Sequence, residues 1–284
     1  MISHLINETI KIQEVLNGYR SDGKTIGFVP TMGALHQGHL DLVQTSKSNM
    51  DVTVVSIFVN PTQFNNPEDF KKYPITVDAD LEKLESMGVD YVFLPTVETM
   101  YPNSASLTLD FGDLERVLEG SFRPGHFNGV GIIVSKLFHL IKPHLAFFGQ
   151  KDLQQVAVIK RLVQDLSFDI QLEIVPTRRE ADGLAMSSRN MRLNNEERQK
   201  ALLLFNNLIT AKKHLIEGLD WPLVKSKVEM AFEVVEDARL EYFELVHPDT
   251  FEIMNDFDPN QKSSICVAAY IGEVRLIDNL PIIP

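Results

Sequence analysis

The chain has 284 residues, 44% hydrophobic and 23% charged, which is the composition of a globular protein with room for one large domain and one small one. Its formal net charge of −12 argues against a broad nucleic-acid surface, which needs clustered lysine and arginine. No apolar run reaches the roughly 20 residues of a membrane-spanning helix, and residues 1–11 contain no signal-peptide core, so we expect a cytoplasmic protein without membrane contact.

The first 176 residues alternate two kinds of hydrophobic pattern. Short β-branched or apolar runs predict strands, and apolar residues at three- and four-residue spacing predict helices between them. Asp78 is expected to cap one helix and Gly88 to end it. The pattern predicts, in order, a strand at 26–31, a helix to about 50, strands at 52–59 and 91–94, a helix over 130–141, a strand at 145–148, a helix over 153–166 and a strand at 170–175. Such alternation predicts an α/β fold, a Rossmann-like, mostly parallel sheet with helices on both faces.

The pattern changes after residue 176. Asn194 and Glu197 form a capping-box pattern that opens a long helix, and Gly218 closes it. Asp220 is expected to open a second helix. Strands are predicted at 240–246, 264–271 and 274–277, the last two joined by a hairpin at Gly272 and Glu273. We therefore predict one domain over 1–176 and a small C-terminal α+β domain over 177–284.

The chain has a single cysteine, Cys266, which cannot form an internal disulfide. It lies in the apolar run 265–271, where we expect a buried, unreactive thiol rather than a nucleophile.

Two histidines follow the first predicted strand. Residues 30–39 read PTMGALHQGH, so a glycine turn leads into the N-terminus of a helix, where N–H groups and a partial positive charge suit an anion. His36 and His39 are three positions apart and project to one side, so both can donate hydrogen bonds to a phosphate. A structural role and a metal site are the alternatives, and no third metal ligand lies nearby in the sequence.

Two more motifs follow strands. Asn60 and Gln63, in SIFVNPTQF, offer amides that can bind neutral or anionic oxygens, although a polar turn is the alternative. The run FGQKDLQQ repeats the strand, glycine and helix arrangement, and Lys151 can contact phosphate oxygens. Asp152 can cap the helix or hold Mg²⁺ through water.

A fourth motif, VPTRREADGLAMSSRN, spans residues 175–190. Its glycine, two hydroxyls and arginines suit a flexible phosphate clamp. A solvated loop with ordinary surface charge is the alternative. The charged residues between 177 and 192 are Arg178, Arg179, Arg189 and Arg192 against Glu180 and Asp182.

These motifs resemble those of the pantothenate synthetases (pantoate–β-alanine ligases), which belong to the nucleotidyltransferase superfamily with the HxGH motif. The resemblance covers about residues 25–192 and includes RPGHFNGV at 123–130. It implies an AMP-forming ligase that condenses pantoate with β-alanine through pantoyl adenylate, with ATP as substrate, Mg²⁺, and a homodimer as the assembly.

The resemblance also implies roles for particular residues, with His39 as the proton donor. The implied catalytic residues are His36, His39, Lys151, Ser187, Ser188 and Arg189. The implied ATP contacts are Met32, Gly33, Ala34, Leu35, His36, Gln37, Gly38, His39, Gly149, Gln150, Lys151, Asp152, Arg178, Met186, Ser187, Ser188 and Arg189. The implied contacts to pantoate and β-alanine are Gln63 and Gln155, with Asn60 beside them.

The chain departs from the family pattern at two positions. Gln150 stands where most members have glutamate, and Arg178 where an apolar residue is commoner, so only a backbone contact carries over there. Arg123 and His126 match the family, and a place near the substrate and surface packing are equal readings for them. Three other functions stay open: a nucleotidyltransferase acting on another small acid or phosphate, a tRNA-charging or tRNA-binding fragment, and a non-catalytic nucleotide-binding regulator.

Overall fold

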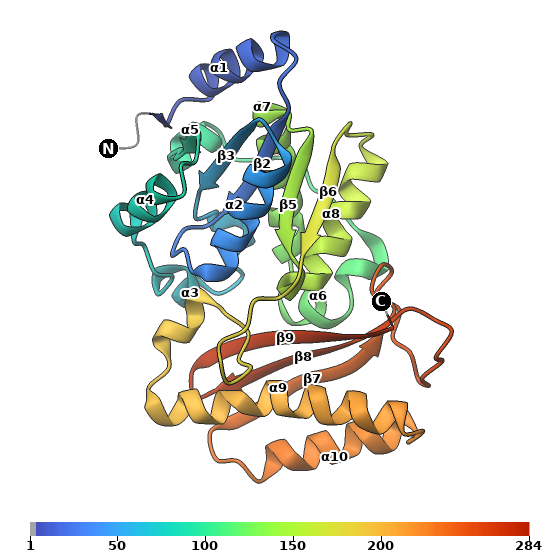
Figure 1. Cartoon of the computed structure of the whole chain (residues 1–284). Helices are drawn as coiled ribbons and strands as arrows, with labels where there is room; N and C mark the ends of the chain where they lie inside the picture. The colour runs from blue at the N-terminus through green and yellow to red at the C-terminus, as the bar shows by residue number, and fades with distance from the viewer. Residues whose placement is uncertain (1–3, 284) are drawn as a thin grey trace. The chain divides into compact units, whose positions relative to one another are not determined.

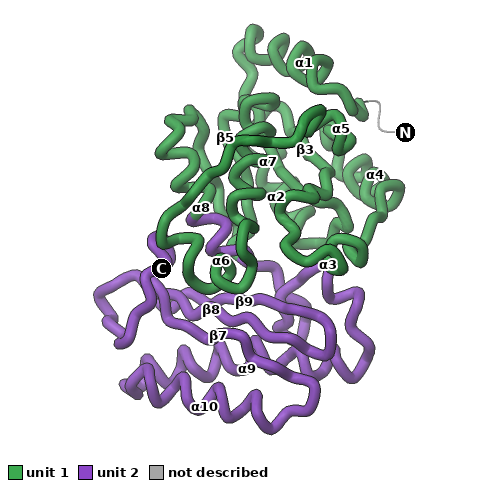
Figure 2. The backbone as a smooth tube through the Cα atoms, turned by 180° about the vertical axis from the view of Figure 1, so that it is seen from behind, with its two compact units in different colours: residues 1–150, 158–176 green, residues 151–157, 177–284 purple. Residues whose placement is uncertain are grey.

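The computed structural model describes residues 4–283. Its contacts divide the chain into two compact units: unit 1, Met1–Gln150 with Val158–Pro176, and unit 2, Lys151–Ala157 with Thr177–Pro284 (Figure 2). This division differs from the predicted one in a single segment, 151–157, which groups with unit 2.

Unit 1 is built on a six-stranded sheet in the order β1-β4-β3-β2-β5-β6, with every pair parallel (Figure 1). The strand predicted at 52–59 ends at Ile57, because its neighbour β2 ends at Thr31, the residue paired with Ile57. The sequence did not predict β1. The strands are β1 Leu5–Ile6, β2 Ile26–Thr31, β3 Val52–Ile57, β4 Tyr91–Phe93, β5 Leu145–Gly149 and β6 Gln171–Val175.

Helices cover both faces of this sheet. One face packs Val29, Val55 and Phe147 against residues of α2 and α4. On the other face Phe138 of α7 meets Phe28 edge-on, with ring centroids 6.5 Å apart. The predicted α/β fold with a parallel sheet covered on both faces is therefore confirmed. The helices are α1 Thr9–Ser21, α2 Gln37–Asn49, α3 Pro67–Lys71, α4 Val77–Ser86, α5 Val97–Met100, α6 Leu118–Phe122, α7 His126–Ile141 and α8 Leu153–Asp165.

One helix boundary in unit 1 differs from its prediction. Thr76, not Asp78, occupies the N-cap position of α4, and Asp78 lies in the first turn. Gly88 follows the end of this helix, as predicted. The prediction for Asp78 was wrong because the helix begins earlier, at Val77, and an acid is favourable in the first turn as well as at the N-cap.

Unit 2 is an antiparallel sheet, β7-β8-β9, packed on two helices. Its core joins Phe243, Val267 and Leu276 of the sheet to Leu208 of α9 and Val228 of α10. Asn194 and Glu197 form the predicted capping box. The elements are α9 Asn195–Ile216, α10 Trp221–Glu233, β7 Ala238–Val246, β8 Ser263–Ile271 and β9 Val274–Ile283.

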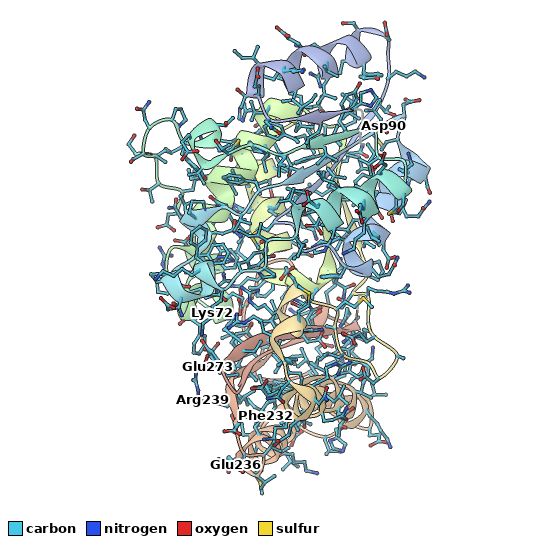
Figure 3. All side chains as sticks on the ribbon, turned by 90° about the vertical axis from the view of Figure 1, so that its left-hand side faces the viewer. Lys72, Asp90, Phe232, Glu236, Arg239 and Glu273 are labelled. Atoms are coloured by element: carbon cyan, nitrogen blue, oxygen red, sulfur yellow. The ribbon has the colours of Figure 1, made fainter. Side chains whose placement is uncertain are left out.

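The β8–β9 hairpin turns at Gly272 and Glu273, as predicted, and β9 runs six residues beyond its predicted end at residue 277. Arg239 of β7 and Glu273 project from the same end of this sheet (Figure 3), and the Arg239 guanidinium lies 4.4 Å from the centroid of the Tyr270 ring. Cys266 is buried in β8 and forms no disulfide, which confirms its predicted burial. Among residues 4–283, no helix has the length and hydropathy required to cross a membrane.

Candidate active site

The two histidines lie where β2 passes into α2. His36 is the N-cap residue of α2 and His39 is its third helical residue. Their rings are tilted by 38° to each other, with centroids 4.1 Å apart, so they occupy the same side of the helix start as predicted. Both side chains are partly exposed. The main-chain N–H of His36 donates to Nδ1 of His39 at 3.3 Å.

This hydrogen bond selects a tautomer of His39. Because Nδ1 accepts a hydrogen bond, the neutral ring carries its proton on Nε2. The Nε2–H group is then a hydrogen-bond donor at the N-terminus of α2, where a helix favours an anion.

A buried carboxylate holds the turn before the histidines. Asp80 of α4 accepts the N–H of Ala34 at 2.8 Å and that of Leu35 at 2.7 Å, and Thr76 donates its hydroxyl to it at 3.1 Å. Ala34 has a left-handed φ of 49°, a conformation that costs about 1 kcal/mol or more outside glycine. Asp80 therefore fixes a strained turn. It was not predicted from the sequence, although an acid on the buried face of a helix was the available signal.

Asn60 and Gln63 lie at the end of β3, and both are buried. Asn60 uses both ends of its amide within the protein. Its Nδ2 donates to Oε1 of Gln63 at 3.1 Å and to the carbonyl of Gly129 at 3.2 Å. Its Oδ1 accepts from the Tyr101 hydroxyl at 2.9 Å and from the Thr62 hydroxyl at 3.0 Å. These contacts make Asn60 a support for Gln63, and its predicted contact with substrate stays a prediction.

Gln63 connects this turn with the histidine motif. Its Nε2 donates to Sδ of Met32, in the turn between β2 and α2, at 3.1 Å. Its main-chain carbonyl lies 2.8 Å from Nδ1 of His126, the first residue of α7. Gly129 lets α7 approach this closely, because a Cβ there would lie 2.3 Å from the carbonyl oxygen of Thr62. Unit 1 therefore brings two predicted motifs together.

Arg123 and His126 are part of this support. Nη1 of Arg123 donates to Nε2 of His126 at 3.1 Å, so His126 carries its proton on Nδ1 and donates to the Gln63 carbonyl. Glu119 pairs with Arg123 at 3.4 Å. His126 is 5% exposed, so the interpretation of this residue as surface packing was wrong.

In unit 2, Lys151 lies in a short 3₁₀ turn, Gln150–Asp152, directly before α8. Its ammonium is 3.7 Å from the half-exposed carboxylate of Asp152, and its main-chain carbonyl accepts a hydrogen bond from Nδ2 of Asn279 at 2.8 Å. Gln155 follows in the first turn of α8 and is partly exposed. Within residues 4–283, no cluster of three or more His, Cys, Asp or Glu side chains is placed to hold a metal ion.

The fourth motif is a hairpin rather than an open loop. Met186 donates its N–H to the carbonyl of Arg178, and Glu180 donates to that of Leu184, each at 2.9 Å. The second arm ends near Met186, and a 3₁₀ turn, Ser188–Arg192, follows it and includes Arg189. The Ser187 hydroxyl accepts the N–H of Arg189 at 3.3 Å. The proposed phosphate-contacting residues, Met186 to Arg189, therefore follow a pair of hydrogen-bonded arms.

Two arginines near the hairpin form ion pairs with different acidic residues. Arg198 of α9 contacts Glu180 at 2.7 Å and Asp182 at 2.8 Å, and its hydrogen bond lowers the pKa of Asp182. Arg179 instead forms a two-point contact with Asp278 of β9, at 2.6 and 3.0 Å. Burial raises the pKa of Asp278, and Arg179 opposes that rise. Arg179 is thus committed to a buried pair, which the count of arginines in the sequence did not predict.

Comparison with known proteins identifies the family. A family model described as pantoate-beta-alanine ligase matches residues 4–281. The pantothenate synthetase of Phocaeicola vulgatus is 48% identical over 282 residues, covering 96% of this chain and 97% of the relative. That of Bacteroides fragilis is 46% identical over 273 residues, covering 96% of each chain.

Solved structures agree with the sequence relatives. The crystal structure of pantothenate synthetase from Thermus thermophilus is similar with a TM-score of 0.92 and 39% identity, covering 99% of this chain and 100% of that one. A pantoate-beta-alanine ligase from Francisella tularensis, complexed with beta-gamma ATP and beta-alanine, has a TM-score of 0.81 and 34% identity, covering 98% and 97%. The chain therefore belongs to the pantoate–β-alanine ligase family.

Proposed function

We propose that this protein condenses pantoate with β-alanine at the expense of ATP, through pantoyl adenylate, and releases AMP and pyrophosphate. One observation carries most weight: Gln63 donates to Met32 in the turn that leads to His36 and His39. An amide suited to a small hydroxy acid thus adjoins a helix start suited to phosphate. The ligase from Francisella tularensis, complexed with beta-gamma ATP and beta-alanine, supports ATP and β-alanine as substrates.

ATP is assigned to the turn and helix start of α2 and to the two motifs of unit 2. His39 donates from Nε2 to phosphate oxygen, and His36 adds a second donor. Lys151 and Arg189 supply positive charge, while Ser187 and Ser188 supply hydroxyl donors. The remaining proposed ATP contacts are Met32, Gly33, Ala34, Leu35, Gln37, Gly38, Gly149, Gln150, Asp152, Met186 and the backbone of Arg178.

The acid site is assigned to Gln63 and Gln155. Hydrogen bonds to Gln63 favour this assignment, because Asn60 bonds its side-chain amide and His126 bonds its main-chain carbonyl. A fixed amide loses little conformational entropy when it binds a ligand. Asn60 acts in this account mainly by orienting Gln63.

The reaction proceeds in two displacements. A carboxylate oxygen of pantoate attacks the α-phosphorus of ATP, the bond from that phosphorus to the bridging oxygen breaks, and pyrophosphate leaves. The amine of β-alanine then attacks the acyl carbon, the bond between that carbon and the AMP oxygen breaks, and AMP leaves as the amine gives up its proton. The donors and cations assigned to ATP stabilise negative charge on the phosphates during the first displacement.

Mg²⁺ is proposed to accompany ATP, where it neutralises phosphate charge. Asp152 is half-exposed and beside the Lys151 ammonium, which suits a water-mediated contact better than a dedicated protein site. A homodimer is proposed because the resemblance to the family implies it. The cytoplasm is proposed as the location, consistent with a single, buried cysteine that forms no disulfide.

The products of ATP test this function. Protein mixed with ATP, pantoate and β-alanine should form pantothenate with one AMP per amide bond, measured by chromatography. ADP in place of AMP would indicate an acyl phosphate and contradict the proposal. AMP transfer to a different acid, with pantoate inert, would support a nucleotidyltransferase of other specificity.

A further inference from the structure

Strand β9 carries two consecutive buried polar residues, and the other residues over 276–283 are apolar. Asp278 is 4% exposed and Asn279 is 2% exposed. Successive residues of a strand point to opposite faces of its sheet. Asp278 pairs in register with Val267, which belongs to the core beneath α9 and α10, and Asn279 pairs with Cys266. The two side chains therefore serve different neighbours.

Asp278 holds the base of the hairpin. Its two oxygens accept from Nη1 and Nη2 of Arg179, in the first arm. Arg179 also donates to the carbonyl of Gly183 at 3.1 Å and lies 4.4 Å from the ring of Phe205 on α9. Gly183, at a φ of 97°, has no room for a Cβ, which would lie 2.1 Å from Phe205. The base of the hairpin therefore has little freedom.

Asn279 holds the segment that carries Lys151. Its Nδ2 donates to the Lys151 carbonyl at 2.8 Å. Its main-chain N–H donates to Asp278 at 2.7 Å, and its carbonyl accepts from Arg179 at 3.2 Å. Adjacent positions of one strand thus fix two segments that lie far apart in the sequence.

We propose that Asp278 and Asn279 are positioning residues for ATP, which hold Lys151 and the segment from Met186 to Arg189 in a fixed relation to each other. This inference rests on the proposed function, because it assumes that both segments contact ATP. Neither residue touches the nucleotide in this account. Each acts through the backbone or side chain that it anchors, so that the phosphate contacts are set before ATP binds.

A purely structural pair is the alternative, and unit 2 offers a matched control. Arg275 of β9 donates to Glu241 of β7 at 2.7 Å, and the Glu241 side chain is 8% exposed. That ion pair links two strands of the same sheet. It involves neither Asn279, which anchors Lys151, nor Asp278, which anchors Arg179. Glu241→Gln should therefore disturb the sheet without a selective effect on ATP.

The primary test is Asn279→Ala, assayed by pyrophosphate exchange at a temperature well below the melting point of each variant. We expect the KM for ATP to rise about 3- to 10-fold, the scale of one lost hydrogen bond. The KM for pantoate should stay within about 2-fold of wild type, because the side chains assigned to the acid site, Gln63 and Gln155, are both kept. Glu241→Gln should leave both KM values unchanged even if its melting temperature falls.

A double variant tests whether Asn279 acts through Lys151. In a Lys151→Ala background the anchored side chain is gone, so adding Asn279→Ala should change the KM for ATP by less than about 2-fold. Full additivity of the two changes would overturn the inference. An unaltered KM for ATP in Asn279→Ala alone would do so as well.

Asp278→Asn provides a second route that keeps the shape of the side chain. It should raise the KM for ATP selectively, and if it does not fold, the Asn279 variants still decide the matter. Wild-type protein that shows no pantoate-dependent exchange would refute the proposed function itself. Wild-type exchange together with unchanged KM values in the Asn279 variant would refute only the positioning role.

Discussion

The N–H of His36 and Nδ1 of His39 form a hydrogen bond of 3.3 Å across the first turn of α2. The bond ties the ring of one histidine to the backbone of the other, and their ring centroids lie 4.1 Å apart. It leaves His39 with its proton on Nε2, the form that donates to a phosphate oxygen. A neutral His39 ring therefore presents its Nε2–H, with the tautomer set by the start of the helix, and the proposed role of His39 as a donor to ATP rests on this form.

His39→Ala should lower kcat for pantoyl adenylate formation by about 10²- to 10³-fold, because a donor that strengthens in the transition state contributes about 3 to 4 kcal/mol. His36→Ala should act similarly and also raise the KM for ATP. His139→Ala is the matched control: His139 lies on α7, exposed, with its Nδ1 on the Ser135 carbonyl. Near-native turnover in both motif variants would remove the histidines from the mechanism.

Gln63→Ala should raise the KM for pantoate far more than the KM for ATP. The loss of a hydrogen bond at a buried site costs about 1 to 3 kcal/mol, or about 5- to 150-fold in affinity. Gln155→Ala should show the same selectivity. Gln44→Ala, an exposed residue of α2, serves as the control. Equal rises in both KM values would place Gln63 outside the acid site.

Asp80→Asn should weaken both stability and catalysis. A carboxamide has one oxygen for the two N–H groups of Ala34 and Leu35, so one buried donor loses its acceptor at a cost of about 1 to 3 kcal/mol. Thermal unfolding and steady-state kinetics check this. Asp78→Asn, a change in the first turn of the same helix, should alter neither by much. A catalytic rate equal to wild type in Asp80→Asn would show that the turn does not need this carboxylate.

Asp51 gives the fold a defined acid dependence. The Thr25 N–H, the Thr25 hydroxyl and Lys24 bond its carboxylate and lower its pKa to about 2. Because the pKa is lower folded than the roughly 3.9 of an unfolded chain, its stabilising effect is present above about pH 4 and is lost as the pH falls toward 2. The difference in melting temperature between wild type and Asp51→Asn should be constant from pH 7 to 5 and shrink below pH 4. A constant difference down to pH 2 would contradict this assignment.

The sequence predicted the sheet well because buried parallel strands leave a nearly continuous apolar record, as in IGFVPT at 26–31, which matches β2 at both ends. It predicted the paired histidines because helix geometry alone places residues three apart on one side. The short strand β1 was missed because two residues carry no periodicity.

The supports of the site could not be read in the same way. Asp80 lies 46 positions from Ala34, and Asn279 lies 128 from Lys151, so neither contact has a local signal. Arg179 counted in the sequence as one more cation near a phosphate clamp, and only the long-range pairing with Asp278 shows its structural role. Arg123 and His126 were ambiguous for the same reason, since their burial depends on contact with the turn at Gln63.

The central claim is that pantoate is activated as an acyl adenylate before β-alanine reacts. No residue of the proposed site is an evident enzyme nucleophile, because Ser187 and Ser188 have no adjacent base in the sequence and Cys266 lies buried in β8, outside every motif. The most direct measurement is the exchange of labelled pyrophosphate into ATP with pantoate present and β-alanine omitted. The account predicts pantoate-dependent exchange and no label on the protein when labelled pantoate is used. Exchange that requires β-alanine, or pantoate label bound covalently to the protein, would contradict it.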